Sequence, residues 1–489
     1  MLFNSHIFML LFLPLLLAGW YFLNWKKKFQ LAQGYLIGMS LWFYAYANLQ
    51  YLWLLLFSCL IGWLLSCVPE KISSEKGKKV LTGVGCVFHL GLLGYFKYSN
   101  FFLENLNTVF HTDFPMLQIL LPVGISFYTF QQLAYLIDRC RKDAPRDSFF
   151  DYLTFMVYFP QLLQGPILLR SEFMGQLKEP ERRRFHAERF SEGIQFFVFG
   201  LAKKVLLADT LAKAVNYGYS NVSMLDSISA LLLAVGYLTE LYFDFSGYCD
   251  MAVGLGKMIG LEVAENFDAP FHSASVKEFW RRWHMTLGRF FTRYVYIPLG
   301  GNRRGKMRTL CNVMIVMLLS GLWHGAAWTF VLWGFLHGVG MIWDNLEHPH
   351  LPKKWMRQAA TFAYVCMTFV FFRAESIAQG IDVLKSIVSL KWNGFVFQMA
   401  SALDMTECYI ITKALSMKLP GLLSWFWLGI FVVLIAICFR VLSGEKVSGV
   451  VALQRQKGYG RLYPVLLAVL FTWSMISMTG VSEYLYFSF

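Results

Sequence analysis

Histidines in the second half of the chain stand where they could move a proton. His324 lies inside an almost continuous apolar run from Val313 to Trp343. A charged imidazolium is costly at membrane depth, and even the neutral ring needs hydrogen-bond partners there, so an intramembrane histidine is a functional candidate by default. Because an imidazole titrates near neutral pH, His324 could act as a general base.

A second candidate, His284, lies in the segment Val276–Pro298, which is too charged to cross a membrane. A helix over this segment would turn His284 toward the protein body, among Trp280, Leu287 and Phe291. It would also gather three arginines within about 40° of one another. These arginines are Arg282, Arg289 and Arg293. The segment therefore predicts an interfacial helix whose arginines face lipid headgroups. For His284, a role in the site and a structural role both stay open.

His337 follows His324 by 13 residues in the same apolar run. A continuous helix would separate the two rings by about 20 Å and place them on different faces. They could then share a metal ion or act as a dyad only if the helix broke near Gly325 or Gly334. We therefore expect no metal site here, and we expect His337 to be structural.

Carboxylates also fall at membrane depth, in the stretch TELYFDFSGYCD at 239–250. Glu240 and Asp244 are four residues apart and so share one face of a helix. Intramembrane acids usually pair with a cation or line a water-filled path. Pairing with a basic residue is favoured for Asp244, while orienting a catalytic histidine or contacting substrate stays open.

The composition is that of a membrane protein, whose helices must position these residues. Of the 489 residues, 57% are hydrophobic and 15% are charged, and the mean hydropathy is +0.48. This predicts an all-α polytopic chain with about 11 transmembrane helices plus re-entrant and interfacial helices. The net charge of +14 is concentrated in loops, so it follows the positive-inside bias and does not indicate nucleic-acid binding. The nine cysteines are scattered and predict neither a disulfide framework nor a zinc site.

The order of loops predicts how the chain is organised. Ile7–Leu23 reads as a retained helix whose N-terminus lies outside. Two consecutive basic loops flank Phe149–Leu169, which predicts that this segment enters and leaves the membrane on one side. Its two prolines and Gly165 fit a broken helix, and an ordinary helix followed by an external basic loop is the alternative. The following arginine run, 178–189, could bind anionic lipid or an acidic partner, or could simply anchor the topology. We expect a single membrane domain, 1–489, with a catalytic core at 276–343, and we find no phosphate-binding loop or nucleophile elbow.

Several long stretches resemble one enzyme family. They are LPVGISFYTFQQLAYLID (121–138), FPQLLQGPI (159–167), LYFDFSGYCDMAVGLGKMIG (241–260), ENFDAPF (265–271), EFWRRWHMTLGRFFTRYVYIPLGGNR (278–303), SGLWHGAAWTFVLWGFLHG (320–338) and FFRAES (371–376). These stretches are similar to those of the membrane-bound O-acyltransferase family, in its bacterial branch of alginate O-acetylases. The resemblance implies a ring of tilted and re-entrant helices around a central funnel.

The resemblance also implies residue roles. The essential catalytic histidine of the WHG motif corresponds to His324. The histidine of the FWRRWH motif, which is the usual second member of the site, corresponds to His284. Further residues are expected to support the site or contact substrate, namely Asp244, Trp280, Trp323 and Arg281. The C-terminal aromatic word resembles one found in cell-wall acylation systems, which makes Tyr486 a candidate acyl relay, although such a tail could equally anchor at the membrane interface. The word FPQLLQGPI departs from relatives at Gln161 or Gln164, where a small or basic residue is common.

The resemblance implies an enzyme of a bacterial inner membrane, together with the donor and partner that follow. It would transfer an acyl group, most readily acetyl, from a cytoplasmic thioester to an extracytoplasmic polysaccharide or cell-wall glycan. No bound cofactor is expected, since acetyl-coenzyme A or an acyl carrier thioester would act as the donor. A periplasmic or extracellular glycan acyltransferase would be the partner, together with membrane lipid. D-alanyl transfer to teichoic acid and non-enzymatic glycan or lipid export are the alternatives.

Overall fold

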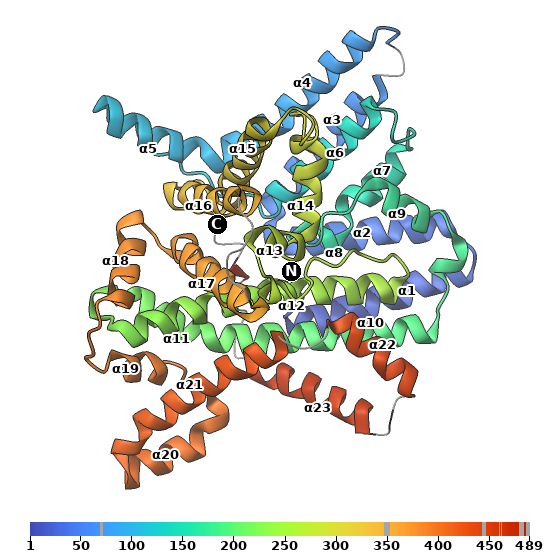
Figure 1. Cartoon of the computed structure of the whole chain (residues 1–489). Coiled ribbons are helices and arrows are strands. Elements are labelled where there is room, and N and C mark those ends of the chain that lie inside the picture. Colours follow the sequence, from blue (N-terminus) through green and yellow to red (C-terminus); the bar gives the residue numbers. More distant parts are fainter. Residues whose placement is uncertain are drawn as a thin grey trace. The chain divides into compact units, whose positions relative to one another are not determined.

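Helices form nearly all of the ordered backbone, because a segment in lipid must satisfy its own backbone hydrogen bonds. The computed structural model describes residues 1–68, 72–346, 353–442, 446–458, 460, 462–478 and 484–485 (Figure 1). These ranges contain helices and no β-strand, which confirms the all-α prediction.

The chain folds into two compact units that alternate along the sequence. Unit 1 comprises Met1–Val198, Tyr248–Asn266 and Thr286–Pro298. Unit 2 comprises Phe199–Gly247, Phe267–Met285 and Leu299–Phe489. The stretch 276–343, where we expected the catalytic core, contributes to both units. Both site histidines lie in unit 2.

Unit 1 contains the first ten helices, of which α10 continues into unit 2. They are α1 (Leu13–Trp25), α2 (Phe29–Asn48), α3 (Leu52–Cys67), α4 (Glu75–Leu93), α5 (Ser99–Phe110), α6 (Ile125–Cys140), α7 (Phe149–Val157), α8 (Phe159–Leu162), α9 (Arg170–Leu177) and α10 (Ala187–Ala202). Unit 1 also receives the second part of α12 (Ser227–Ile259) and nearly all of α14 (Met285–Phe291).

Unit 2 is built around the helices that carry the histidines. It contains α11 (Asp209–Ser220), the first part of α12, α13 (Val276–Arg282), α15 (Lys306–His324), α16 (Trp328–Leu346), α17 (Lys354–Arg373), α18 (Ile377–Val388), α19 (Phe395–Ser401), α20 (Tyr409–Lys418), α21 (Pro420–Leu442), α22 (Val447–Lys457) and α23 (Leu462–Ser477). Within it, α15 and α16 pack side by side, and α17 packs on α16 (Figure 1).

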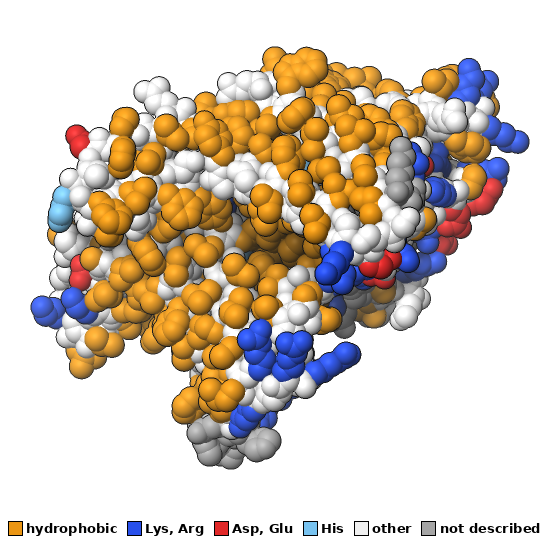
Figure 2. Space-filling view, turned by 90° about the horizontal axis from the view of Figure 1, so that it is seen from above, with side chains coloured by type: hydrophobic (Ala, Val, Ile, Leu, Met, Phe, Trp, Pro, Cys, Tyr) orange, Lys and Arg blue, Asp and Glu red, His pale blue; other side chains and the backbone are white. Residues whose placement is uncertain are grey.

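Six helices in the described part of the chain are long and apolar enough to cross a membrane. They are Phe8–Trp25, Leu49–Cys67, Glu75–Phe110, Ser227–Ile259, Lys306–His324 and Pro420–Phe439. Hydrophobic side chains cover most of the face seen in Figure 2, whereas Lys and Arg gather in groups near its edges. A multi-pass membrane protein is therefore confirmed, while the total of about 11 crossings stays a prediction.

The segment with two prolines is broken, as the sequence indicated. Residues 149–169 form α7 and the four-residue α8, and the chain then continues without helix to α9. At 1.5 Å per residue, neither helix spans the roughly 30 Å hydrocarbon core. Gly165 closes the turn, because a Cβ there would overlap the carbonyl oxygen of Pro160. The return of this segment to the side it entered stays a prediction.

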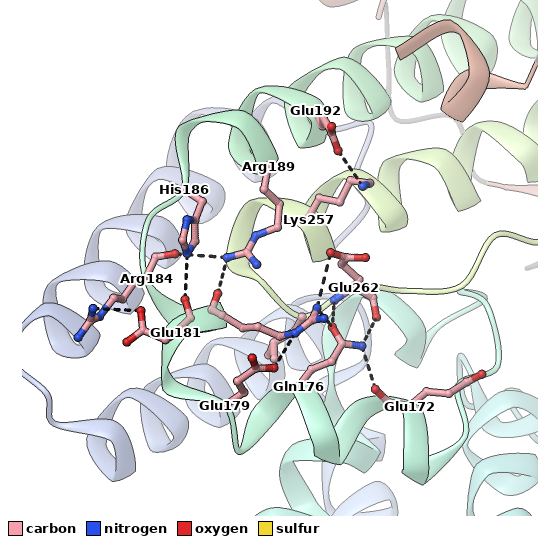
Figure 3. Close-up of polar contacts among 12 residues, drawn as sticks. Glu172, Gln176, Glu179, Glu181, Arg184, His186, Arg189, Glu192, Lys257 and Glu262 are labelled. Carbon is pink, nitrogen blue, oxygen red and sulfur yellow. Dashed lines mark hydrogen bonds and ion pairs between the residues drawn. The ribbon is translucent and has the colours of Figure 1, made fainter. Parts of the chain in front are cut away.

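The arginine run after this segment is used inside unit 1. Arg182 pairs with Glu179 at 2.9 Å and Arg184 with Glu181 at 3.0 Å (Figure 3). Arg189 donates to the backbone carbonyl of Arg182 at 2.5 Å. These guanidinium groups therefore make contacts within the folded segment, and their role as an anchor of the topology stays a prediction. Binding of anionic lipid or an acidic partner stays a prediction.

Candidate active site

His324 is placed by the hairpin of α15 and α16. Helix α15 ends at His324, and Gly325 follows with an extended backbone (φ −158°, ψ 152°). A Cβ at Gly325 would overlap the ring of Phe330, so only glycine fits this turn. The apolar run is therefore two helices with a break near Gly325, one of the possibilities left open by the sequence.

Aromatic rings surround the His324 imidazole. The ring centroids of Trp333 and Phe372 each lie 5.1 Å from that of His324, and the Trp323 centroid lies 4.9 Å away. The side chain of His324 is buried, at 4% exposure. Such a cage excludes bulk water and strengthens any electrostatic interaction made within it.

His284 reaches the same aromatic cluster from a different segment. Its ring centroid lies 6.1 Å from that of Trp323 and 4.7 Å from that of Phe245. Trp323 therefore contacts both histidines. Burial lowers the pKa of His284 to about 3, so the ring is neutral at physiological pH. A neutral imidazole can accept a proton or a hydrogen bond.

The helix predicted over 276–298 is wrong in one respect, because it breaks at His284. Residue 284 has φ 46°, between the end of α13 and the start of α14. Helix α13 begins at a side-chain cap, since Ser275 Oγ accepts from the backbone N–H of Glu278 at 3.1 Å. Asp344 on α16 also accepts from the backbone N–H of Lys277 at 2.8 Å. These contacts fix α13 to the hairpin that carries His324.

The arginines of this segment pair with carboxylates, and whether they also face lipid headgroups stays a prediction. Arg282 pairs with Glu278 at 2.9 Å within α13, as the four-residue spacing predicts. In unit 1, Arg293 pairs with Asp138 at 2.9 Å, and Arg289 pairs with Glu172. The stripe expected to face lipid headgroups is therefore used for structure.

His337 is a structural histidine, as expected. The indole N–H of Trp280 donates to Nδ1 of His337 at 3.3 Å, which leaves the ring proton on Nε2. That nitrogen lies 2.9 Å from Thr368 Oγ1, whose hydroxyl donates to the carbonyl of Val365. Both ring nitrogens are engaged, so His337 is not available for proton transfer. Trp280 belongs to this network, although the sequence suggested that it lies beside His284.

Asp244 pairs with a lysine, which confirms the favoured interpretation. Lys204 Nζ lies 2.6 Å from Asp244 Oδ1 and 2.8 Å from Asp209 Oδ1, and the lysine is 2% exposed. Asp244 and Glu240 both line a cavity of about 720 Å³, confirming that they share a face. Phe372, which contacts His324, lines this cavity too, so the His324 cage and the polar cavity share this ring.

Other predicted residues take different places. Arg281 is exposed on α13, and it is not among the residues in ring contact with His284 or His324. Tyr486 lies outside the described residues. In the described part of the chain, no group of three or more His, Cys, Asp or Glu side chains is arranged to hold a metal ion.

Sequence reasoning missed Trp333, Phe372 and Lys204. The doublet Lys203-Lys204 within an apolar helix was the available signal for Lys204, because a lysine at that depth needs a carboxylate partner. Phe372 belongs to the motif FFRAES, which carries part of the family resemblance but did not by itself indicate a role for this phenylalanine. Trp333 gave no signal, since a tryptophan in an apolar helix most often packs in the core.

Comparisons with known proteins show the family of this chain. Residues 142–381 match the MBOAT, membrane-bound O-acyltransferase family. The chain is similar to a peptidoglycan O-acetyltransferase of Helicobacter pylori, with 35% identity over 423 residues covering 80% of each chain. It is similar to a probable alginate O-acetylase of Azotobacter vinelandii, with 39% identity over 389 residues, 77% of this chain and 76% of the relative. A teichoic acid D-alanyltransferase of Streptococcus thermophilus is 28% identical over 253 residues, 49% of this chain and 58% of the relative.

Proposed function

Since the chain belongs to the membrane-bound O-acyltransferase family, we propose that it moves an acetyl group from a cytoplasmic thioester toward an extracytoplasmic polysaccharide. The observation that carries the proposal is the convergence of His324 and His284 on Trp323, next to a polar cavity. Acetyl is favoured because relatives named as O-acetyltransferases match about four fifths of the chain, with 35% to 39% identity.

The chemistry needs a base, a dry site and an activated acyl group. A thioester supplies its own activation, so the protein must position the reactants and move a proton. Neutral His324 accepts the proton of the attacking hydroxyl while the hydroxyl oxygen bonds to the thioester carbonyl carbon. The carbon–sulfur bond then breaks, and the imidazolium returns its proton to the leaving thiolate. His284, also neutral, orients the donor or shares the proton transfer.

The donor is expected to approach from the basic end of unit 2. Exposed cations precede or begin α15, namely Arg303, Arg304, Lys306 and Arg308. Loops rich in Lys and Arg mark the cytoplasmic side of a membrane protein. Their charge would attract the phosphates of coenzyme A or an acidic carrier protein. Because a glycan is bulky and exported, a separate extracytoplasmic transferase completes delivery.

D-alanyl transfer to teichoic acid is the second candidate. It is favoured by the similarity to teichoic acid D-alanyltransferases, which reaches 28% identity over about half of this chain. The shorter match and lower identity place it behind acetyl transfer. Export without acyl transfer is set aside by membership of an acyltransferase family.

Replacing His324 tests the proposal. His324→Ala should lower glycan acylation by about a hundred-fold or more, because it removes the general base. The measurement is the acid that mild base releases from envelope polysaccharide, in cells whose only copy of the gene encodes the variant. We expect the released acid to be acetate rather than D-alanine. His272→Ala is the matched control, since His272 is an exposed histidine of the same unit. Normal acylation by a correctly inserted His324→Ala protein would rule out the mechanism.

A further inference from the structure

The cavity beside the His324 cage opens at one end of unit 2. It is lined by Phe330 at the start of α16 and by Phe372 and Arg373 at the end of α17. The basic residues of α15 and α17 lie at the opposite ends of these helices, since α15 begins at Lys306 and α17 at Lys354. By the positive-inside bias, this cavity faces away from the cytoplasm, and we call it the acceptor-side cavity.

A buried ion pair stands in the wall of this cavity. Lys204 lies in a π-helical turn, Lys203–Ala208, that continues α10, and such turns often mark functional positions. Its ammonium bonds to Asp244 Oδ1 at 2.6 Å, and the Lys204 and Asp244 side chains are each 2% exposed. Burying two charges carries a desolvation penalty, so a buried pair alone is weak evidence for stability and calls for another reason.

The pair contacts Tyr484 and Leu485, and we call these two residues the C-terminal segment. The backbone N–H of Leu485 donates to Asp244 Oδ2 at 3.1 Å. The ammonium of Lys204 lies 4.6 Å from the ring centroid of Tyr484, a cation–π geometry, and Tyr484 is fully buried. Leu485 also lines the acceptor-side cavity. Each member of the ion pair therefore holds one residue of the segment.

Helix α23 lies beside the ion pair. It packs against the π-helical turn that carries Lys204.

From these contacts we infer that Lys204 and Asp244 are positioning residues, which clamp Tyr484 and Leu485 into the wall of the acceptor-side cavity and make the C-terminal segment part of the acyl-transfer site. The inference rests on the proposed function, because it assigns the segment to that reaction. Its chemical content is electrostatic: the carboxylate fixes the backbone at Leu485, and the ammonium fixes the ring of Tyr484.

The test removes the clamp while keeping the fold. Replacing a buried ion pair by apolar residues of similar size is often neutral or stabilising, so Lys204→Met combined with Asp244→Leu should still fold. Asp209, the other partner of Lys204, is partly exposed and can be solvated. Glu192→Leu with Lys257→Met is the matched control, because this 3.0 Å pair joins the same helices, α10 and α12 (Figure 3), and neither residue lines the cavity.

Two readouts separate the clamp from the chemistry. A Leu485→Cys substitution, which keeps the backbone N–H, reports accessibility of the segment to a hydrophilic maleimide. Losing the clamp should speed its labelling by about ten-fold or more in detergent-solubilised protein. Base-released acetate should fall by at least about ten-fold, because a misplaced reacting group lowers the rate steeply. The control pair should change neither value.

Each result decides the inference. Faster labelling together with lower acylation supports it. Unchanged labelling overturns the clamp, and faster labelling with normal acylation overturns the role of the segment in the reaction. If the unmodified protein transfers no acetyl group at all, the proposed function fails, while the labelling rates still report whether the clamp exists.

Discussion

His284 shows how a single residue combines chemistry with backbone strain. It has a left-handed backbone, φ 46°, which L side chains adopt at a cost of about 1–3 kcal/mol unless they are Gly or Asn. Strain of this kind persists only where the surroundings hold it. Here the caps of α13 and the packing of His284 against Phe245 and Trp323 provide that support.

This conformation predicts a separation of stability from activity. His284→Asn should keep the melting temperature in detergent, because Asn tolerates the left-handed region, yet it should lose most acyl transfer. His284→Val should lower the free energy of unfolding by about 1–3 kcal/mol, because a β-branched residue is strained there. Thermal denaturation and base-released acetate measure the two effects. Full activity of a stable His284→Asn protein would assign the residue a structural role alone.

At the scale of single residues, the sequence predicted the burial of His284 correctly, while the catalytic role of His324 stays a prediction. An imidazole within an apolar run has few physical reasons to exist, so its signal is strong. The break at His284 could not be predicted, because no Gly, Pro or Asn stands there and the helical period runs on through it. The same continuous helix led to the wrong neighbour for Trp280.

Among the elements, the α15–α16 hairpin has the tightest packing at the site. A Cβ at Gly334 would overlap the carbonyl oxygen of Met317 and lie 3.3 Å from the Cα of Gly321. Two helices can approach this closely only through glycine, as is common between membrane helices. The contact also fixes the neighbouring Trp333 against His324.

Gly334→Ala should therefore destabilise the protein and reduce transfer. Overpacking of this kind costs about 1–3 kcal/mol, and displacing α16 moves the cage around His324. Gly429→Ala on α21 is the matched control, since a Cβ there meets nothing within 4 Å. That change should be neutral, or stabilising by about 0.5–1 kcal/mol. Equal melting temperatures for the two variants would show that the hairpin tolerates separation.

The ends and breaks of helices could be predicted where proline or glycine stands at them. Pro160 and Gly165 announced the broken segment, and Gly325 allowed the break after His324. The π-helical turn Lys203–Ala208 has no such signal, because it depends on how the helix packs and places Lys204 toward Asp244. The pairing of the arginines with acids distant in sequence likewise needed the tertiary structure.

At the scale of the whole molecule, sidedness decides whether the proposed reaction is possible. In unit 2 the cations of the α15 start and of the α17 start, Lys353, Lys354 and Arg357, lie at one end of an antiparallel set of helices. Charge counted over short loops orients such helices with this end in the cytoplasm. We therefore expect the acceptor-side cavity to face outward, and under the proposed function donor and acceptor would reach the histidines from opposite sides.

Labelling in intact cells tests this orientation. A membrane-impermeant maleimide should label Lys391→Cys, an exposed position beyond the outer end of α17, in intact spheroplasts. It should label Arg303→Cys, an exposed position before α15, only after lysis, because that end faces the cytoplasm. The unsubstituted protein gives the background from exposed Cys311. The reverse pattern would place the cavity on the donor side, and the acetyl group would then have no route from His324 to an exported glycan.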